Sequence, residues 1–135
     1  MRRMLIPVLG ILSLLLVSPA VASDEAVAPF TPERFEELQK RDALILVEVH
    51  ASWCPTCRAQ APIVDKLATD AAFSSLQALR LDWDTHRRQA RTMGAPRQST
   101  ILLFQGERRI GRIIGETRED KLREFVQESL QKAKE

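Results

Sequence analysis

The sequence has little cysteine and little histidine, which limits the sites that it can build. Only two of its 135 residues are cysteines and only two are histidines. A structural zinc site usually takes four ligands, so His50 and His86 would have to meet the single cysteine pair in the folded chain. A disulfide between Cys54 and Cys57 would close too short a loop to remove much entropy from the unfolded chain. We therefore favour a redox use of the cysteines, and zinc binding remains the alternative.

An excess of charge of one sign is also missing. The full chain has 20 basic and 18 acidic residues, and removal of residues 1–22 would take away two basic residues and leave a formal charge of zero. Arginines cluster at positions 87, 88 and 91 and at positions 108, 109 and 112. In a neutral chain with interspersed acids, such clusters indicate solvated faces of a helix and a strand. We expect no nucleic-acid partner.

Long apolar runs are absent except at the N-terminus. Two arginines precede an apolar stretch over residues 4–17, and small residues follow up to Ala22. This pattern predicts a signal peptide over residues 1–22, cleaved before Ser23. The stretch is shorter than the roughly 20 residues of a membrane span, so an uncleaved membrane anchor is the alternative. In both cases the domain of residues 23–135 is exported to the periplasm or another extracytoplasmic compartment, where disulfides persist.

Hydrophobic periodicity predicts a single α/β domain without repeats or linkers. The expected strands cover residues 44–49, 76–84, 100–104 and 108–114. One expected helix begins at Thr31, and three others cover residues 58–68, 85–92 and 117–132. Residues 23–30 are expected to form a loose leader. A short edge strand near residues 27–30 would add to the four strands of the sheet. This order predicts a mixed central sheet of about four strands flanked by helices.

Both cysteines lie in the segment Trp-Cys-Pro-Thr-Cys at residues 53–57, directly after an apolar run. A helix that follows a buried strand here would place Cys54 at its N-terminus and Cys57 one turn further in. Free backbone N–H groups and the helix dipole at that end favour a thiolate. Such a thiolate can attack a disulfide and is released when the second thiol attacks in turn. The segment predicts thiol–disulfide exchange, with Cys54 attacking and Cys57 resolving. The dithiol is its own redox centre, so we expect neither a bound cofactor nor a metal.

Several segments together resemble the thioredoxin family, and the similarity covers nearly all of residues 23–135. They are the segment around the cysteines, Pro62 within the following helix, residues 80–84, residues 100–104 and Gly115. The resemblance implies a thioredoxin-like fold and a protein-disulfide oxidoreductase, with protein disulfides and a redox partner protein as partners. The chain has no room for the helical insertion of Dsb-type oxidants, so a monomeric reductase is favoured over an oxidase.

Two departures from the family pattern lie close to the cysteines. Pro55 and Thr56 stand between them, where the family has Gly-Pro, and this dipeptide tunes the thiol pKa and the redox potential. Glu48 stands on the preceding strand, where the family usually has a buried Asp. The resemblance implies that Glu48 exchanges a proton with Cys57, and a buried carboxylate of raised pKa suits that work. An ion pair between Glu48 and a lysine or arginine is the alternative.

The third departure is Ser99, which occupies the position of the family's cis-proline. A cis bond before a residue other than proline costs about 3–4 kcal/mol, against about 0.5–1 kcal/mol before proline. We therefore predict a trans bond between Gln98 and Ser99. The resemblance implies a groove for an extended substrate, lined by Trp53, Pro55, Thr56, Gln98, Ser99 and Gly115. The loss of the proline also leaves open a second function, an exported binding or assembly factor for a protein or a metal with little redox turnover.

Overall fold

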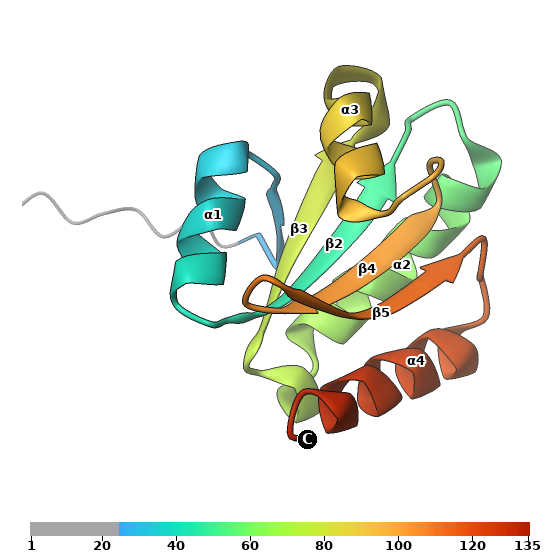
Figure 1. The fold of residues 1–135 in the computed structure, drawn as a ribbon. Helices are drawn as coiled ribbons and strands as arrows, with labels where there is room; N and C mark the ends of the chain where they lie inside the picture. The colour runs from blue at the N-terminus through green and yellow to red at the C-terminus, as the bar shows by residue number, and fades with distance from the viewer. Residues whose placement is uncertain (1–24) are drawn as a thin grey trace, which may run out of the picture.

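The computed structural model describes residues 25–135. The predicted signal peptide and its cleavage site before Ser23 lie outside these residues. The described chain forms a five-stranded sheet with helices on both faces (Figure 1). The strands are β1 (Val27–Pro29), β2 (Leu44–His50), β3 (Leu76–Asp82), β4 (Thr100–Gln105) and β5 (Arg108–Ile114). The helices are α1 (Pro32–Lys40), α2 (Pro55–Thr69), α3 (Trp83–Met93) and α4 (Glu119–Lys132), with a 3₁₀ turn at Ala71–Phe73.

The sheet is mixed, as the sequence predicts. Its strand order is β1-β3-β2-β4-β5, with β1, β3 and β2 parallel and with β4 antiparallel to β2 and to β5. The short edge strand expected near residues 27–30 is present as β1 and pairs with β3, so the sheet has five strands rather than about four. Because β2 is the central strand, its C-terminal end lies between the ends of its neighbours, directly before the cysteine segment.

Several predicted boundaries differ from the structure. The helices expected over residues 58–68, 85–92 and 117–132 begin at Pro55, Trp83 and Glu119. The strand expected over residues 76–84 ends at Asp82, which is the N-cap of α3 and accepts a hydrogen bond from the backbone N–H of Asp84. Trp83 is buried although it lies in the helix. Because its side chain points into the core there as it would from a strand, the alternation of apolar and polar residues continued past the true end of β3.

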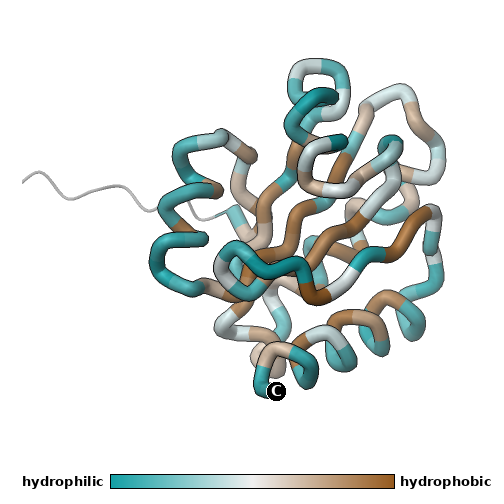
Figure 2. The backbone as a smooth tube through the Cα atoms, in the orientation of Figure 1, coloured by the Kyte–Doolittle hydropathy of each residue, from teal (hydrophilic) through white to brown (hydrophobic). Residues whose placement is uncertain are grey.

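The two faces of the sheet bury separate hydrophobic cores. Phe35 and Leu38 of α1 pack with Trp83 and Ala90 of α3 on one face, together with both cysteines. Residues of α2 and α4 cover the other face. Figure 2 shows the hydrophobic residues concentrated along the central strands and the hydrophilic ones along the outer sides of the helices. Over residues 25–135, the helices are too short and too polar to cross a membrane.

Candidate active site

The two cysteines lie at the start of α2. Cys54 is the N-cap residue, and the following Pro55 occupies the first helical position, where a missing N–H costs nothing. The backbone N–H of Cys57 donates to Sγ of Cys54 over 3.1 Å. Both thiols are free, and the two residues are 4% and 1% exposed. A hydrogen bond donated to sulfur favours negative charge there, so the geometry suits Cys54 as the attacking thiolate.

The environment of Cys57 favours the protonated thiol. Burial raises the pKa of Cys57 to about 11, and the hydrogen bond and the charge of Cys54 act in the same direction. Backbone hydrogen bonds from Ala51 and Ser99 oppose this shift without cancelling it. A thiol of this pKa is almost wholly protonated near neutral pH, so it needs a base before it can attack a sulfur.

Glu48 lies on β2 and is fully buried. Its Oε2 accepts a hydrogen bond from Nε of Arg80 over 2.7 Å, across the pairing of β2 with β3. The ion pair that was the alternative for Glu48 is therefore present. Burial nevertheless raises the pKa of Glu48, because desolvation outweighs the attraction to Arg80. The second oxygen, Oε1, has no hydrogen-bond partner in the described structure, and the exchange of a proton with Cys57 stays a prediction.

The Ser99 loop confirms the predicted trans bond, since residues 25–135 contain no cis peptide. Ser99 adopts a φ of 58°, and its backbone N–H donates to the carbonyl of Val49 over 2.8 Å. Its own carbonyl accepts a hydrogen bond of 2.8 Å from the N–H of Gly115, which has a φ of 71°. The loop before β4 is thereby joined to the end of β2 and to the end of β5. This places Ser99 and Gly115 together beside Cys57.

A buried glutamine that sequence reasoning missed completes this loop. Gln60 of α2 is fully buried, and its Nε2 donates to the carbonyls of Ser99 and Glu116 over 3.3 and 2.8 Å. The signal for it was present in the sequence, because Gln60 is the polar member of the buried stripe on α2 that also contains Cys57 and Val64. A polar side chain in such a stripe requires buried partners, which here are backbone carbonyls.

The outer wall of the site is formed by Trp53, which is 54% exposed. Its Nε1 donates to Oδ2 of Asp84 over 2.9 Å, and this holds the ring against the start of α3. Among the other predicted groove residues, Pro55 is exposed, and Thr56 and Gln98 are half-buried. The structure thus brings the predicted site residues to one edge of the sheet, at the end of β2 and the start of β4.

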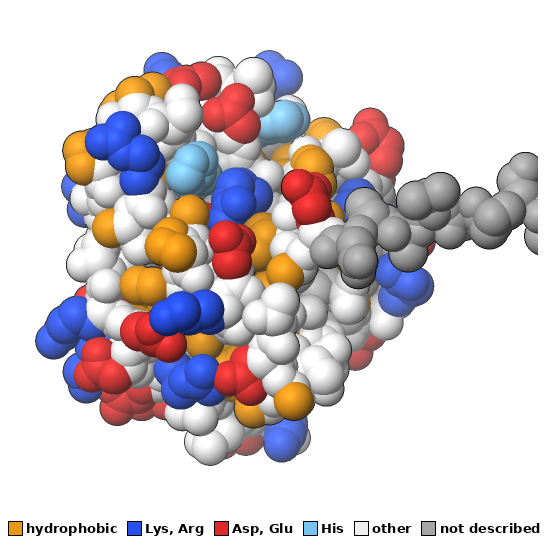
Figure 3. Space-filling view, turned by 180° about the vertical axis from the view of Figure 1, so that it is seen from behind, with side chains coloured by type: hydrophobic (Ala, Val, Ile, Leu, Met, Phe, Trp, Pro, Cys, Tyr) orange, Lys and Arg blue, Asp and Glu red, His pale blue; other side chains and the backbone are white. Residues whose placement is uncertain are grey.

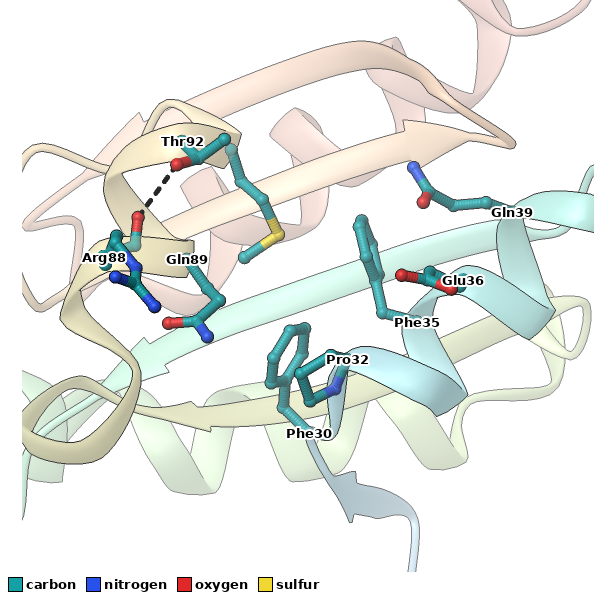
Figure 4. A pocket seen from close by; sticks show the side chains of 9 residues that line it. Phe30, Pro32, Phe35, Glu36, Gln39, Arg88, Gln89 and Thr92 are labelled. Carbon is teal, nitrogen blue, oxygen red and sulfur yellow. Dashed lines mark hydrogen bonds between the residues drawn. The ribbon is translucent and has the colours of Figure 1, made fainter.

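Two further findings concern other kinds of site. An apolar hollow between α1 and α3 contains neither cysteine (Figure 4). It is lined by Phe30, Phe35 and Met93 and by polar residues including Arg88. In the part of the chain that the structure describes, there is no group of three or more Cys, His, Asp or Glu side chains arranged to hold a metal ion.

Comparisons with known proteins by sequence and by structure relate the chain to thioredoxins. The family model for thioredoxin matches residues 26–128. The chain is 34% identical over 71 residues to a thioredoxin of Mycobacterium tuberculosis. This match covers 53% of this chain and 60% of that protein. It is 31% identical over 94 residues to protein disulfide-isomerase erp38 of Neurospora crassa, covering 67% of this chain and 26% of that protein.

The chain thus spans less than two thirds of the length of these curated relatives. Among solved structures, Trxlp from Edwardsiella tarda superposes with a TM-score of 0.70 at 30% identity, covering 74% of this chain and 97% of that one. The family model, the identities and the superposition agree with the fold. The chain belongs to the thioredoxin family.

Proposed function

We propose that this protein is an exported thiol–disulfide oxidoreductase that reduces protein disulfides. One observation carries the proposal: Cys54 caps α2 with its sulfur bonded to a backbone N–H, and the buried Cys57 thiol lies one turn behind it. Membership of the thioredoxin family supports disulfide oxidoreductase chemistry. The backbone around Ser99, next to the cysteines, is where the family resemblance predicts a groove for an extended substrate segment.

The reaction needs two exchanges of sulfur bonds. In the first, the Cys54 thiolate attacks one sulfur of the substrate disulfide, which forms a mixed disulfide and releases the other substrate sulfur as a thiol. In the second, Cys57 loses its proton and attacks Sγ of Cys54, which releases the second substrate thiol. The two electrons gained by the substrate come from the protein dithiol, which becomes a Cys54–Cys57 disulfide. Glu48 takes the proton of Cys57, and its raised pKa suits that exchange.

The direction of electron flow is tested by the reduction potential of the domain of residues 23–135, equilibrated in glutathione buffers. A value near the roughly −270 mV of thioredoxin supports a reductase that is fed with electrons by a redox partner protein. A value near about −120 mV would instead make the protein an oxidase. The absence of a reversible dithiol couple would end the oxidoreductase proposal and favour a binding or assembly factor.

The sequence of attacks is tested with single cysteine variants. Cys57→Ser should accumulate mixed disulfides with its partners because the resolving thiol is missing, and Cys54→Ser should accumulate none. Non-reducing electrophoresis followed by mass spectrometry identifies the bound partners. If Cys57→Ser traps no partner while wild-type protein binds one reversibly, the binding-factor alternative replaces the enzyme.

Export and oligomeric state are part of the same proposal. We expect the protein in the periplasm or another extracytoplasmic compartment, as a monomer, with Ser23 as the first residue of the mature chain. Cell fractionation and N-terminal sequencing test the first expectation, and analytical ultracentrifugation tests the second. A membrane-bound protein that still begins at Met1 would show that the N-terminal segment is an uncleaved anchor.

A further inference from the structure

Charge is distributed very unevenly along the described chain. Residues 83–115 contain seven arginines and only two acidic residues, whereas the rest of residues 25–135 contains eleven basic and fifteen acidic residues. All seven arginines are exposed and belong to α3, to β5 or to the loop before β4. Arg108, at the start of β5, donates to the carbonyl of Lys132 near the C-terminus, and the other six form a separate set. We call this set the arginine face, and it consists of Arg87, Arg88, Arg91, Arg97, Arg109 and Arg112.

Four of the six arginines gather around α3. Arg87 and Arg91 both lie over the ring of Trp83, at 5.4 and 5.5 Å from its centre. From β5, Arg109 and Arg112 reach the last residues of α3 and donate to the carbonyls of Met93 and Gly94 over 3.1 and 3.0 Å.

Two contacts join the arginine face to the active site. On α3, Nη2 of Arg87 lies 3.9 Å from Oδ1 of Asp84, and the other carboxylate oxygen of Asp84 accepts the hydrogen bond from Trp53. In the loop before β4, Arg97 lies beside Gly115, which is hydrogen-bonded to Ser99. Both sides of the predicted groove are therefore bordered by arginines.

These arginines are not neutralised by neighbouring acids. Within residues 25–135, the pair between Arg87 and Asp84 is the single ion pair that any of the six makes. Ion pairs are more frequent among the other cations of residues 25–135, for example Lys66 with Glu119 and Arg123 with Asp70, although Arg34, Lys40 and Arg58 make none. The side seen from behind also carries acidic and basic side chains interspersed (Figure 3).

Helix capping explains only part of this face. Arg109 and Arg112 stabilise the carbonyl end of α3, where cations are favoured by the helix dipole. Arg88 and Arg97 have no such use, since their side chains make no hydrogen bond or ion pair with the described residues. Figure 4 shows Arg88 at the rim of the hollow between α1 and α3. Exposed like charges held together without counter-charges cost stability, which points to a counter-charge on a partner.

We propose that the arginine face docks an acidic segment of the protein whose disulfide this dithiol reduces. The inference rests on the proposed function, and it adds the chemistry of the partner: glutamate or aspartate side chains that flank the reacting cysteine. A protein partner is favoured over nucleic acid because the arginines border the groove beside Cys54, where the substrate disulfide must enter. Attraction over this surface would mainly speed the encounter of the two proteins, so it should weaken with salt.

The test uses three synthetic peptides of one length, each with a single cysteine activated as a 2-pyridyl disulfide and flanked by glutamate, lysine or serine. Release of pyridine-2-thione gives the second-order rate constant of the reduced protein. We expect the glutamate peptide to react about tenfold faster than the lysine peptide at low salt. This preference should nearly vanish at about 1 M salt, where the Debye length is about 3 Å.

Matched variants assign the preference to the face. The double variant Arg88→Gln/Arg97→Gln should lose most of the preference and keep its rate with the serine peptide. The control Arg108→Gln/Lys134→Gln removes the same charge at the opposite end of the sheet, near the C-terminus, and should behave as wild type (Figure 1). Equal rates for all three peptides would overturn the docking inference and leave the redox function standing. No reaction with any peptide would refute the function itself. A single-stranded oligonucleotide that binds the wild type, and not the Arg88/Arg97 variant, would assign the face to nucleic acid instead.

Discussion

Replacing Glu48 by glutamine should slow the second sulfur exchange and change its dependence on pH. Since the pKa of Cys57 is raised to about 11, only about one Cys57 thiol in 10⁴ is ionised at pH 7. A positioned base typically contributes a factor of about 10²–10⁴ to such a proton transfer. Glu48→Gln keeps the shape of the side chain and an oxygen for Arg80, but it cannot accept the proton. We therefore expect resolution of the mixed disulfide to be about 10²-fold slower at pH 7.

The assay follows both released thiols after rapid mixing of reduced protein with a model disulfide. In the variant, release of the first thiol should be unchanged, whereas release of the second should rise about tenfold for each pH unit towards the pKa of Cys57. Glu128→Gln, an exposed position on α4, is the matched control and should behave as wild type. If Glu48→Gln and wild type share one pH profile for the second release, Cys57 does not depend on Glu48 and the proton-exchange hypothesis is wrong.

Three further predictions concern stability. Gln60→Leu removes the side-chain donor of the Glu116 carbonyl and one of the two donors of the Ser99 carbonyl, which keeps its bond from the N–H of Gly115. Urea titration should therefore show a loss of about 1 kcal/mol in the free energy of unfolding, and an unchanged free energy would refute the stabilising role of Gln60. Ser99→Pro cannot keep the φ of 58° or the hydrogen bond to Val49, so the same titration should show destabilisation by more than about 1 kcal/mol; an equally stable variant would mean that the loop can rearrange. Burial raises the pKa of Glu48 in the folded state, so folding favours the neutral carboxyl. The contribution of Glu48 to the free energy of unfolding is therefore greatest below the unfolded pKa of 4.5, and it is lost as the pH rises through the folded pKa. The stability of wild type relative to Glu48→Gln should therefore fall as the pH rises above 4.5, and a constant difference would contradict the raised pKa.

Much of the fold could be predicted because its signals are local. The run from Leu44 to Val49 is apolar enough to identify a strand buried on both faces, and it forms the centre of the sheet. A hydroxyl at Thr31 followed by Pro32 is typical of a helix start, and the side chain of Thr31 does accept the N–H of Arg34. The end of β3 was missed because Trp83 is buried from a helix at a position where a strand residue would be buried too.

The position of the dithiol follows from the sequence alone. Two cysteines separated by two residues, after a buried strand and before a helix, place a dithiol at a helix N-terminus whatever the rest of the chain does. The sequence also determined that the Gln98–Ser99 bond is trans, since a cis bond is too costly without proline.

The surroundings of the dithiol depend on how distant segments of the chain pack together. The pairing of Glu48 with Arg80 depends on the register of β2 against β3, and the bond from Gln60 to Ser99 joins positions 39 residues apart. The arginines of α3 and β5 come from two separate clusters in the sequence, which alone indicated ordinary solvated faces. They meet because β5 lies where its side chains reach the end of α3. Contacts between distant segments are set by packing of the whole domain, which local patterns of residues do not encode.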